Sequence, residues 1–507
     1  MHLYGRTYKI KGALFHPDIL VIGDQVVLRD ILGKEAYSYG LYPSCWVDAL
    51  LIFVVREVKS PISRTLVERV IGRGLVWAEG DVHKRQRHEL APFFTFSAQA
   101  VRNMFNNVST CTNIGVENLE SHIINNASDP KQGLTVNIME STESVTLDIT
   151  GRFVLNYDFE SGKSHIAKFF KETWKKQCSV SLYWTSVLGH VIIRAFPFIA
   201  HLPIPTLEAQ LAVKKALRDI AQTAANQTVN EGQEKDLLTT MVRVRYGAPE
   251  MSSTIMYVLS TLRSISRRTM INKPDYQVCT IAFTSQDTTA GTLTFALHQL
   301  AMHPKYQSRL RDEIIQLGRE PTYDDLMSRM PWLDAITMEI LRLRPIGPHI
   351  ERVAAEHTVL RFGNRVQTSD GAEISEVAIK AGQTIIIPIM AMNRLKSVWG
   401  DDADDFNPER WLDPARLEHV DRKFGWNGML TFSDGPRQCI GYRMALLIFK
   451  TALAAYIRKL EFHDTGAVIH ARFVGTLQPY IASEEEKGTQ MPLRVTLVNE
   501  SGVDPAY

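Results

Sequence analysis

The chain has 507 residues, of which 57 are basic and 55 acidic, and its net charge is +2. A charge this close to zero provides no field that attracts nucleic acid, so we expect no nucleic-acid partner. The five cysteines are scattered and lack CxxC spacing, which argues against a disulfide framework and favours a reducing compartment. No composition break or internal repeat divides the sequence, so we predict a single domain over residues 1–507.

The first 24 residues alternate polar and apolar side chains, which predicts two strands joined by a turn at Lys11 and Gly12. Further along, the stretch "EGDVHKRQRHELAPFF" predicts a helix on which His83 and Arg87 lie one turn apart. Two such side chains on one face suit the binding of an anion, although a basic surface helix shows the same pattern. The sequence has no apolar run of the roughly 18 residues that a membrane-spanning helix needs.

The stretch "TSQDTTAGTLTFALHQLAMHP", residues 284–304, predicts part of a long buried helix, because apolar residues flank its polar ones on both sides. Thr288 is placed to donate its hydroxyl hydrogen to the carbonyl of Thr284, four residues earlier. The neighbouring carboxylate of Asp287 then makes a proton relay available. A polar patch on a solvated helix face is the alternative, but buried polar groups must be satisfied or functional.

Two more stretches place charged residues among apolar ones. In "MEILRLRP", Glu339 and Arg342 share one helix face, and in "FNPERWL", Arg410 follows a proline-fixed turn between aromatic residues. If Arg410 reaches Glu339, two guanidiniums clamp one carboxylate. Solvated surface pairs of little energetic value are the alternative.

Strand-like alternation returns at residues 353–360, at residues 378–389 and in "PLRVTLV" near the C-terminus. Apolar residues at three- and four-residue spacing dominate most of the sequence between residues 277 and 460. The predicted fold is therefore mainly helical with small peripheral β-sheets.

The most specific stretch is "FSDGPRQCIGYRMALLIFK", residues 432–450. Gly435 permits a tight turn, Arg437 brings a positive charge, and Gly441 removes a side chain close to Cys439. The pattern becomes helical after Gly441, so Cys439 lies near a helix N-terminus, where backbone N–H groups stabilise a thiolate. These features predict a metal-ligating sulfur rather than a thiol that only fills space.

Together these stretches resemble the cytochrome P450 family, the haem-thiolate monooxygenases, over nearly the whole chain. The family's F-x-x-G-x-R-x-C-x-G motif is complete from Phe432 to Gly441, and its E-x-x-R and P-E-R stretches occur in the expected order. The resemblance implies one catalytic domain, with haem b between the long distal helix and the helix that follows the cysteine. Phrases such as "NRLKSVWGDDADDFNPERWL" are similar to eukaryotic microsomal members from basidiomycete fungi.

By resemblance, Cys439 is the metal ligand, the thiolate that binds the haem iron. The other residues implied to bind or surround the haem are Arg437, Arg87, His83, Arg352, Phe432, Gly435 and Gly441. The implied catalytic pair is Asp287 and Thr288, the acid and alcohol that deliver protons to dioxygen. The implied structural triad is Glu339, Arg342 and Arg410.

Three features depart from the family's pattern. Ser285 stands where the family has a glycine that lets the distal helix approach the haem. Residues 41–58 and 245–263 are atypical insertions, and we hypothesise that they are retained introns. The family's eukaryotic members begin with a membrane anchor that is missing from this sequence, so we expect a truncated start, with residues 184–205 making peripheral membrane contact.

The predicted function is insertion of one oxygen atom from O₂ into a lipophilic small molecule, in fungal secondary metabolism such as terpenoid tailoring. The resemblance implies a monomer on the cytosolic face of the endoplasmic reticulum membrane, with electrons from NADPH through cytochrome P450 reductase. Two alternatives stay open: a haem-thiolate isomerase or dehydratase that does not use O₂, and a non-catalytic haem-binding product of a faulty gene model. Retention of Asp287 and Thr288 argues against the first.

Overall fold

The structure is a computed structural model, and it describes residues 6–12, 18–34, 61–94, 98–129, 131–155, 157–182, 211–212, 214–220, 272–368 and 370–498. The interpretations of residues 41–58, 184–205 and 245–263 all lie outside the described residues.

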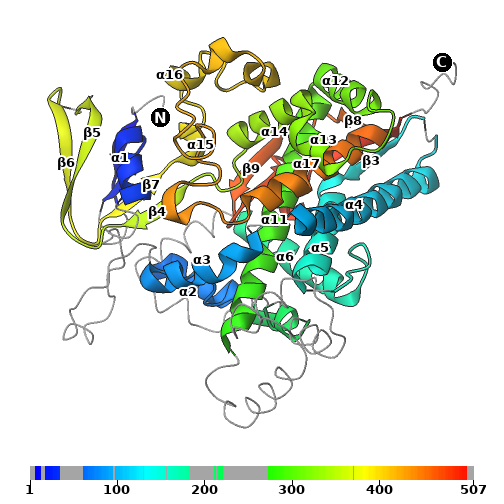
Figure 1. The fold of residues 1–507 in the computed structure, drawn as a ribbon, viewed down its shortest axis with the longest axis horizontal. Coiled ribbons are helices and arrows are strands. Elements are labelled where there is room, and N and C mark those ends of the chain that lie inside the picture. The colour runs from blue at the N-terminus through cyan, green and yellow to red at the C-terminus, as the bar shows by residue number, and fades with distance from the viewer. Residues whose placement is uncertain are drawn as a thin grey trace, which may run out of the picture.

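Helices make up most of the described chain, and Figure 1 shows them gathered beside a smaller strand-rich region. The helices of the first half are α1 (Gln25–Arg29), α2 (Pro61–Ile71), α3 (Gly80–Phe94), α4 (Ala98–Asn126), α5 (Ile138–Thr150) and α6 (His165–Leu182). Those of the second half are α11 (Asn272–Met302), α12 (Pro304–Ile315), α13 (Tyr323–Ser328), α14 (Pro331–Leu343), α15 (Ile389–Met392), α16 (Lys396–Trp399) and α17 (Tyr442–Lys459). Short 3₁₀ or π segments are η1 (Asp30–Lys34), η2 (Gly151–Leu155), η4 (Pro408–Trp411), η5 (Pro414–Leu417), η6 (Gly435–Arg437) and η7 (Glu485–Lys487).

The strands form small separate sheets. A mixed four-stranded sheet has the order β1 (Thr7–Ile10), β2 (Ile19–Ile22), β7 (Thr384–Ile387), β4 (Ile350–Val353), in which only β2 and β7 run parallel. An antiparallel sheet has the order β3 (Leu134–Asn137), β11 (Pro492–Leu497), β8 (Leu460–Asp464). Two hairpins complete the set: β5 (Thr358–Gln367) with β6 (Glu373–Ile379), and β9 (Ile469–Phe473) with β10 (Leu477–Ile481).

The long helix α11 runs through the centre of the helical region, against α5 and α17 (Figure 1). Every residue from 289 to 301 is buried, including the polar His298 and Gln299, so this part of the helix is enclosed on all sides. It ends at Met302 because Pro304, which begins α12, disfavours helical geometry in the residue before it. The predicted long buried helix is therefore confirmed.

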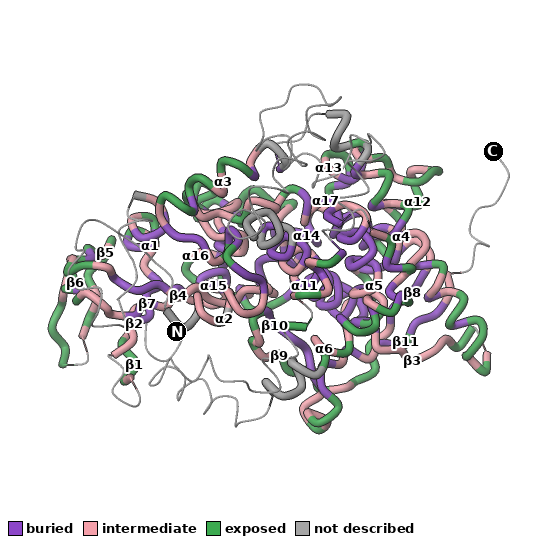
Figure 2. The backbone as a smooth tube through the Cα atoms, turned by 90° about the horizontal axis from the view of Figure 1, so that it is seen from below, coloured by how far each residue is buried: buried purple, intermediate pink, exposed green. Residues whose placement is uncertain are grey.

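Three clusters of buried apolar side chains hold the described elements together, and the two larger ones frame the site. The larger one is built from α4, α5, α11, α14 and α17, and Figure 2 shows the buried backbone concentrated along these helices. The smaller one lies under the four-stranded sheet and includes Leu28, Leu32, Phe424 and Leu430. It joins the N-terminal elements to the segment that leads into the cysteine stretch.

The predicted strands are confirmed in part. The first two strands form as predicted, but their connection spans residues 11–18 rather than a tight turn at Lys11 and Gly12. The predicted strand at 353–360 is two strands, because the chain leaves the four-stranded sheet at Ala354, whose N–H donates to Gln383 O at 3.0 Å. The prediction at 378–389 fails similarly, since Gly382 adopts φ +83° and turns the chain between β6 and β7.

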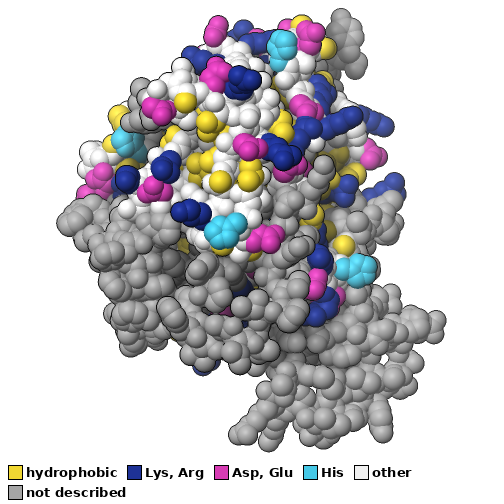
Figure 3. Space-filling model, turned by 90° about the vertical axis from the view of Figure 1, so that its left-hand side faces the viewer, with side chains coloured by type: hydrophobic (Ala, Val, Ile, Leu, Met, Phe, Trp, Pro, Cys, Tyr) yellow, Lys and Arg dark blue, Asp and Glu magenta, His cyan; other side chains and the backbone are white. Residues whose placement is uncertain are grey.

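The face that carries the β5–β6 hairpin is mixed in charge. On the coloured part of Figure 3, basic and acidic side chains alternate around a few hydrophobic ones. This distribution agrees with the net charge of +2 and provides no single-sign surface there.

Candidate active site

The loop before α17 is shaped by its glycine and by backbone hydrogen bonds. Gly435 adopts φ +64°, and a Cβ there would lie 2.1 Å from the carbonyl oxygen of Leu32 in η1. The N–H of Cys439 donates to Phe432 O at 2.8 Å, which closes the loop. The ring of Phe432 packs edge-on against Trp426, with centroids 5.1 Å apart. These contacts fix the position of Cys439.

Cys439 presents an accessible thiol just before Gly441, the N-cap of α17. Burial raises the pKa of the thiol, while the N–H of Gly441 and the charge of Arg87 oppose that rise. Helix-terminal N–H groups and a nearby guanidinium both stabilise a thiolate, so the sulfur is suited to ligate a metal.

Positive charge gathers around the cysteine loop. Arg87 of α3 donates to the carbonyl of Gln438 at 2.7 Å. Arg437 forms an ion pair with Glu79, and both are buried. Arg352 of β4 is 7% exposed, and burial, then the charge of Arg437, lowers its pKa to about 10. Three guanidinium groups therefore lie around the cysteine loop, and positive charge of this kind favours the binding of an anionic group.

His83 is also part of this region. It lies on α3 one turn before Arg87 and is 4% exposed, whereas Lys84, Arg85 and His88 of the same helix are exposed. The sequence pattern predicted both positions but not Glu79, the acidic partner of Arg437. The sequence feature that could have indicated Glu79 is its position as a single glutamate directly before the basic helix α3.

On α11, threonine hydroxyls bond back to helix carbonyls. Thr288 Oγ1 donates to Thr284 O at 2.7 Å, as the sequence predicts, and Thr284 Oγ1 donates to Thr280 O at 2.7 Å. Between residues 279 and 301, the residues known to be only half-buried are Phe283, Thr284, Ser285 and Thr288. Thr284 and Thr288, one helical turn apart, therefore lie on the less enclosed part of α11.

Asp287 is buried and held by neutral donors from three other positions. Trp174 Nε1 of α6 donates to its Oδ1 at 2.8 Å, Gln478 Nε2 of β10 donates to the same oxygen at 3.3 Å, and Thr476 Oγ1 donates to Oδ2. Burial raises the pKa of Asp287, and the three donors act in the opposite direction. None of the three donors can be predicted from local sequence, because they lie 113 to 191 positions away from Asp287.

Ser285 makes its contacts with another helix. Its hydroxyl lies 3.1 Å from Thr150 Oγ1 of α5 and 3.4 Å from Ala282 O of its own helix. The side chain therefore uses its polar atom in the packing of α11 against α5.

The structure brings Glu339, Arg342 and Arg410 together in the interior. Arg342 donates to both carboxylate oxygens at 2.9 and 2.8 Å, and Arg410 Nε donates to Oε1 at 3.0 Å. Trp411 Nε1 and the N–H of Asn407 add donors at 2.9 Å each. The three charged side chains are at most 1% exposed, so the solvated-pair alternative is excluded.

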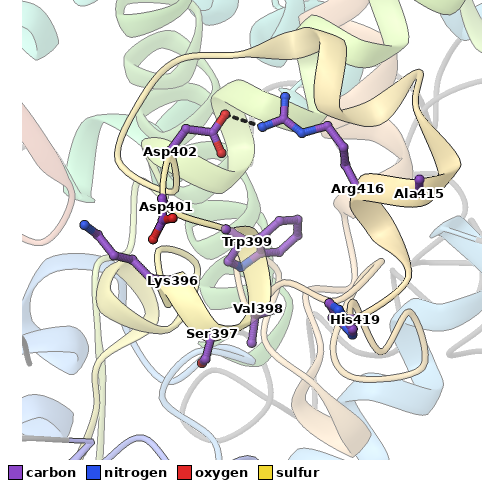
Figure 4. Close-up of a pocket in the computed structure, with 10 residues that line it drawn as sticks. Lys396, Ser397, Val398, Trp399, Asp401, Asp402, Ala415, Arg416 and His419 are labelled. Carbon is purple, nitrogen blue, oxygen red and sulfur yellow. Dashed lines mark hydrogen bonds and ion pairs between the residues drawn. The ribbon is translucent and has the colours of Figure 1, made fainter.

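A cavity of about 490 Å³ lies elsewhere, between α16 and η5 (Figure 4). It is lined by Lys396, Ser397, Val398, Trp399, Gly400, Asp401, Asp402, Ala415, Arg416 and His419. Its lining contains neither Cys439 nor any residue of α11. We therefore do not assign the reaction to it.

A sequence model of the family described as Cytochrome P450 matches residues 49–473. The chain belongs to the cytochrome P450 family. The matched range includes the cysteine loop, the Asp287–Thr288 pair and the Glu339 triad. As a cytochrome P450, the protein is a monooxygenase that uses haem iron, O₂ and electrons from a redox partner.

Its relatives include several fungal P450s. Cytochrome P450 monooxygenase claP of Ampulloclitocybe clavipes is 29% identical over 96% of this chain and 89% of the relative. Cytochrome P450 monooxygenase claQ of the same fungus is 28% identical over 98% of this chain and 87% of the relative. Ganoderic acid synthetase CYP5150L8 of Ganoderma lucidum is 27% identical over 91% of this chain and 82% of the relative. The predicted similarity to basidiomycete members is confirmed.

The residues around Cys439 fit a haem group. An accessible thiol with a helix-terminal N–H donor would suit ligation of the haem iron, and the guanidinium groups of Arg87, Arg352 and Arg437 would suit the two carboxylates that haem carries. Among the described helices, none combines the length and apolarity required to cross a bilayer.

Proposed function

We propose that this P450 inserts one atom of O₂ into a C–H bond or an alkene of a lipophilic small molecule. The observation that carries the proposal is the pairing of an accessible thiol at Cys439 with a buried acid, Asp287, next to the half-buried alcohol of Thr288 on α11. A haem-thiolate protein that only binds its cofactor has no use for a polar acid–alcohol pair in a buried helix.

In this proposal the cysteine loop and its cationic surroundings hold the haem. Cys439 is the thiolate ligand, and Phe432, Gly435 and Gly441 give the loop its shape. The propionates are bound by the residues that carry positive charge or an imidazole around the loop: Arg437, Arg87, Arg352 and His83. Bound haem supplies the activation of O₂, and a thiolate ligand favours O–O cleavage over simple O₂ storage.

The same proposal gives α11 the task of proton supply. Thr288 holds its hydroxyl at a defined position by donating to Thr284 O at 2.7 Å. Its oxygen still accepts a hydrogen bond, so a proton can pass to it from a donor on the side of Asp287. Glu339, Arg342 and Arg410 take no part in the chemistry and hold the fold beside the cysteine loop.

The substrate class is proposed from the apolar lining and from the relatives. Ile346 lies against α11, where a Cβ on Gly291 would come within 2.7 Å of its Cδ1. Phe283 packs edge-on against Trp174 of α6, with centroids 4.9 Å apart, and is half-buried. Because relatives include a ganoderic acid synthetase, we place the reaction in fungal secondary metabolism such as terpenoid tailoring.

Partners and location follow the same proposal. NADPH-cytochrome P450 reductase supplies the electrons to a monomeric enzyme with one catalytic domain over residues 1–507. The enzyme works at the cytosolic face of the endoplasmic reticulum membrane, with peripheral contact through residues 184–205. The retained-intron hypothesis for 41–58 and 245–263 is tested by sequencing the transcript, and abundant spliced mRNA containing both segments would contradict it.

The first experiment is the difference spectrum of the reduced, carbon-monoxide-bound protein. We expect the strongly red-shifted Soret band of cysteine-thiolate ligation, and Cys439→Ala should abolish it. A band typical of histidine-ligated haem in the wild type would overturn the assignment of Cys439.

Turnover with NADPH and reductase then separates the monooxygenase from its rivals. A monooxygenase consumes NADPH and O₂ together with product formation, whereas an isomerase, a dehydratase or a passive haem protein does not. Asp287→Asn and Thr288→Ala should keep the red-shifted band but lower the rate of product formation by about 10²-fold, with NADPH diverted to peroxide. Full coupling in both variants would contradict the relay.

A further inference from the structure

The β9–β10 hairpin brings two polar side chains to the buried acid of α11. Strand β10 lies next to α11 (Figure 2), and a Cβ on Gly291 would lie 3.8 Å from the carbonyl oxygen of Leu477. Side chains two positions apart point to the same side of an extended chain, so Thr476 and Gln478 face the same way. Both reach Asp287, and all three side chains are at most 8% exposed.

These three side chains form a small hydrogen-bond network. Gln478 Nε2 donates to Thr476 Oγ1 at 2.8 Å, and Thr476 Oγ1 donates to Asp287 Oδ2. Both hydrogens point toward Asp287, which suits the ionised carboxylate, because that form only accepts. Gln478 Oε1 is different, since it is buried and has no hydrogen-bond partner among the described residues. A buried acceptor without a partner is costly, so this oxygen is available for a second arrangement of the network.

The second arrangement follows from what each group can accept. A protonated Asp287 must donate its own hydrogen, and the indole of Trp174 cannot accept it, because an indole N–H only donates. The hydroxyl of Thr476 both donates and accepts. It can accept from Asp287 and give its own hydrogen to Gln478 Oε1 once the amide has turned over. The oxygen that lacks a partner then gains one.

We propose that Thr476 and Gln478 are positioning residues that hold the carboxyl of Asp287 in both its ionised and its protonated form. The hydrogens of the network point toward the ionised carboxylate and away from the protonated acid. Only the hydroxyl rotates and the amide turns over, so every hydrogen of the two side chains stays on its own heavy atom. The charge changes only by the proton that Asp287 gains or loses. This inference rests on the proposed role of Asp287.

The infrared spectrum of the haem-loaded protein tests the network directly. On acidification, the wild type should gain the C=O band of a protonated carboxyl that is missing in Asp287→Asn. In Thr476→Val that carboxyl has lost its acceptor, so the band should move to higher frequency, whereas Thr476→Ser keeps the hydroxyl and should leave the band in place. An unshifted band in Thr476→Val, or no such band in the wild type, would overturn the inference.

Turnover with NADPH and reductase provides the second test, with a matched control. Thr496 is buried to a similar extent, at 7% exposed, and its hydroxyl lies 3.0 Å from His463 Nε2 in another sheet. We expect Thr476→Val and Gln478→Met to lower product formed per NADPH by about tenfold. Thr476→Ser should stay within about twofold of the wild type, and Thr496→Val should leave coupling unchanged.

The outcomes separate this inference from misfolding and from its foundation. The red-shifted carbon-monoxide band, measured in each variant, shows that the haem pocket is intact. Equal coupling in Thr476→Val and Thr496→Val would overturn the inference. If Asp287→Asn uncouples the reaction but Thr476→Val does not, only this inference fails, whereas full coupling in Asp287→Asn removes the proposed relay as well.

Discussion

Two buried carboxylates of this protein are held in opposite ways. Glu339 is clamped by two guanidiniums, an indole N–H and a backbone N–H, whereas Asp287 is held by an indole, a hydroxyl and an amide, all neutral. Cations fix a carboxylate in its ionised form, but neutral donors only offset part of the cost of burial. The first arrangement suits a group that must never change its charge, and the second suits one that exchanges protons.

The largest loss of stability is expected at Glu339, whose carboxylate is held by the guanidinium groups of Arg342 and Arg410. Glu339→Gln keeps the shape of the side chain but leaves two buried guanidiniums without their counter-charge, which should cost about 3–5 kcal/mol and the retention of haem. Urea unfolding and haem content measure both. The control is Glu409→Gln, whose exposed pair with Arg309 at 3.2 Å should be worth less than about 1 kcal/mol.

If Glu339→Gln were isolated with full haem content and an unchanged urea midpoint, the clamp would not be what holds this part of the fold. If Glu339→Gln and Glu409→Gln lost stability and haem to the same extent, the protein would instead be sensitive to the removal of any negative charge.

The two tryptophans provide a sharper comparison, because each donates an indole N–H to one of the carboxylates, at 2.8 Å from Trp174 and at 2.9 Å from Trp411. Each Trp→Phe change should cost about 1–3 kcal/mol of stability, since a hydrogen bond to a charged group is lost. Only Trp174→Phe should also change the pH dependence of turnover. Losing a donor raises the pKa of Asp287 further, so Asp287 becomes protonated at a higher pH than in the wild type.

Product formed per NADPH across a pH series checks this prediction. The pH at which Asp287 becomes protonated should move upward in Trp174→Phe and stay in place in Trp411→Phe. Equal shifts in both variants, or a downward shift in Trp174→Phe, would contradict the distinction between the two clamps.

The smallest effect is expected for Ser285→Gly, which restores the residue typical of the family. The variant loses the hydrogen bond to Thr150 at 3.1 Å. Glycine also has more backbone freedom in the unfolded chain, which favours unfolding of the helix, so the free energy of unfolding should fall by about 1–2 kcal/mol. Coupling should stay within about twofold of the wild type. A large gain in turnover would mean that the serine hinders the oxygen site after all. Thermal unfolding and an NADPH-coupling assay give the two values.

The sequence predicted the local parts of this site and few of the long-range ones. The helix after Gly441 and the hydrogen bond from Thr288 to Thr284 follow from spacing along the chain. The partners of Asp287 do not, because Trp174 and Gln478 become its neighbours only when α6 and β10 pack on α11. The strand predicted at 353–360 fails for the same reason, since pairing with β7 decides where β4 ends.

The contact between Gly435 and Leu32 bears on the order in which the protein assembles. The same two segments are joined by the ion pair of Arg29 with Asp421, across 392 positions of sequence. Contacts between such distant parts of a chain close late, because a large loop must be ordered first. We therefore expect the cysteine loop to reach its final shape only after these two distant segments have met, and haem to be captured after that contact rather than before it.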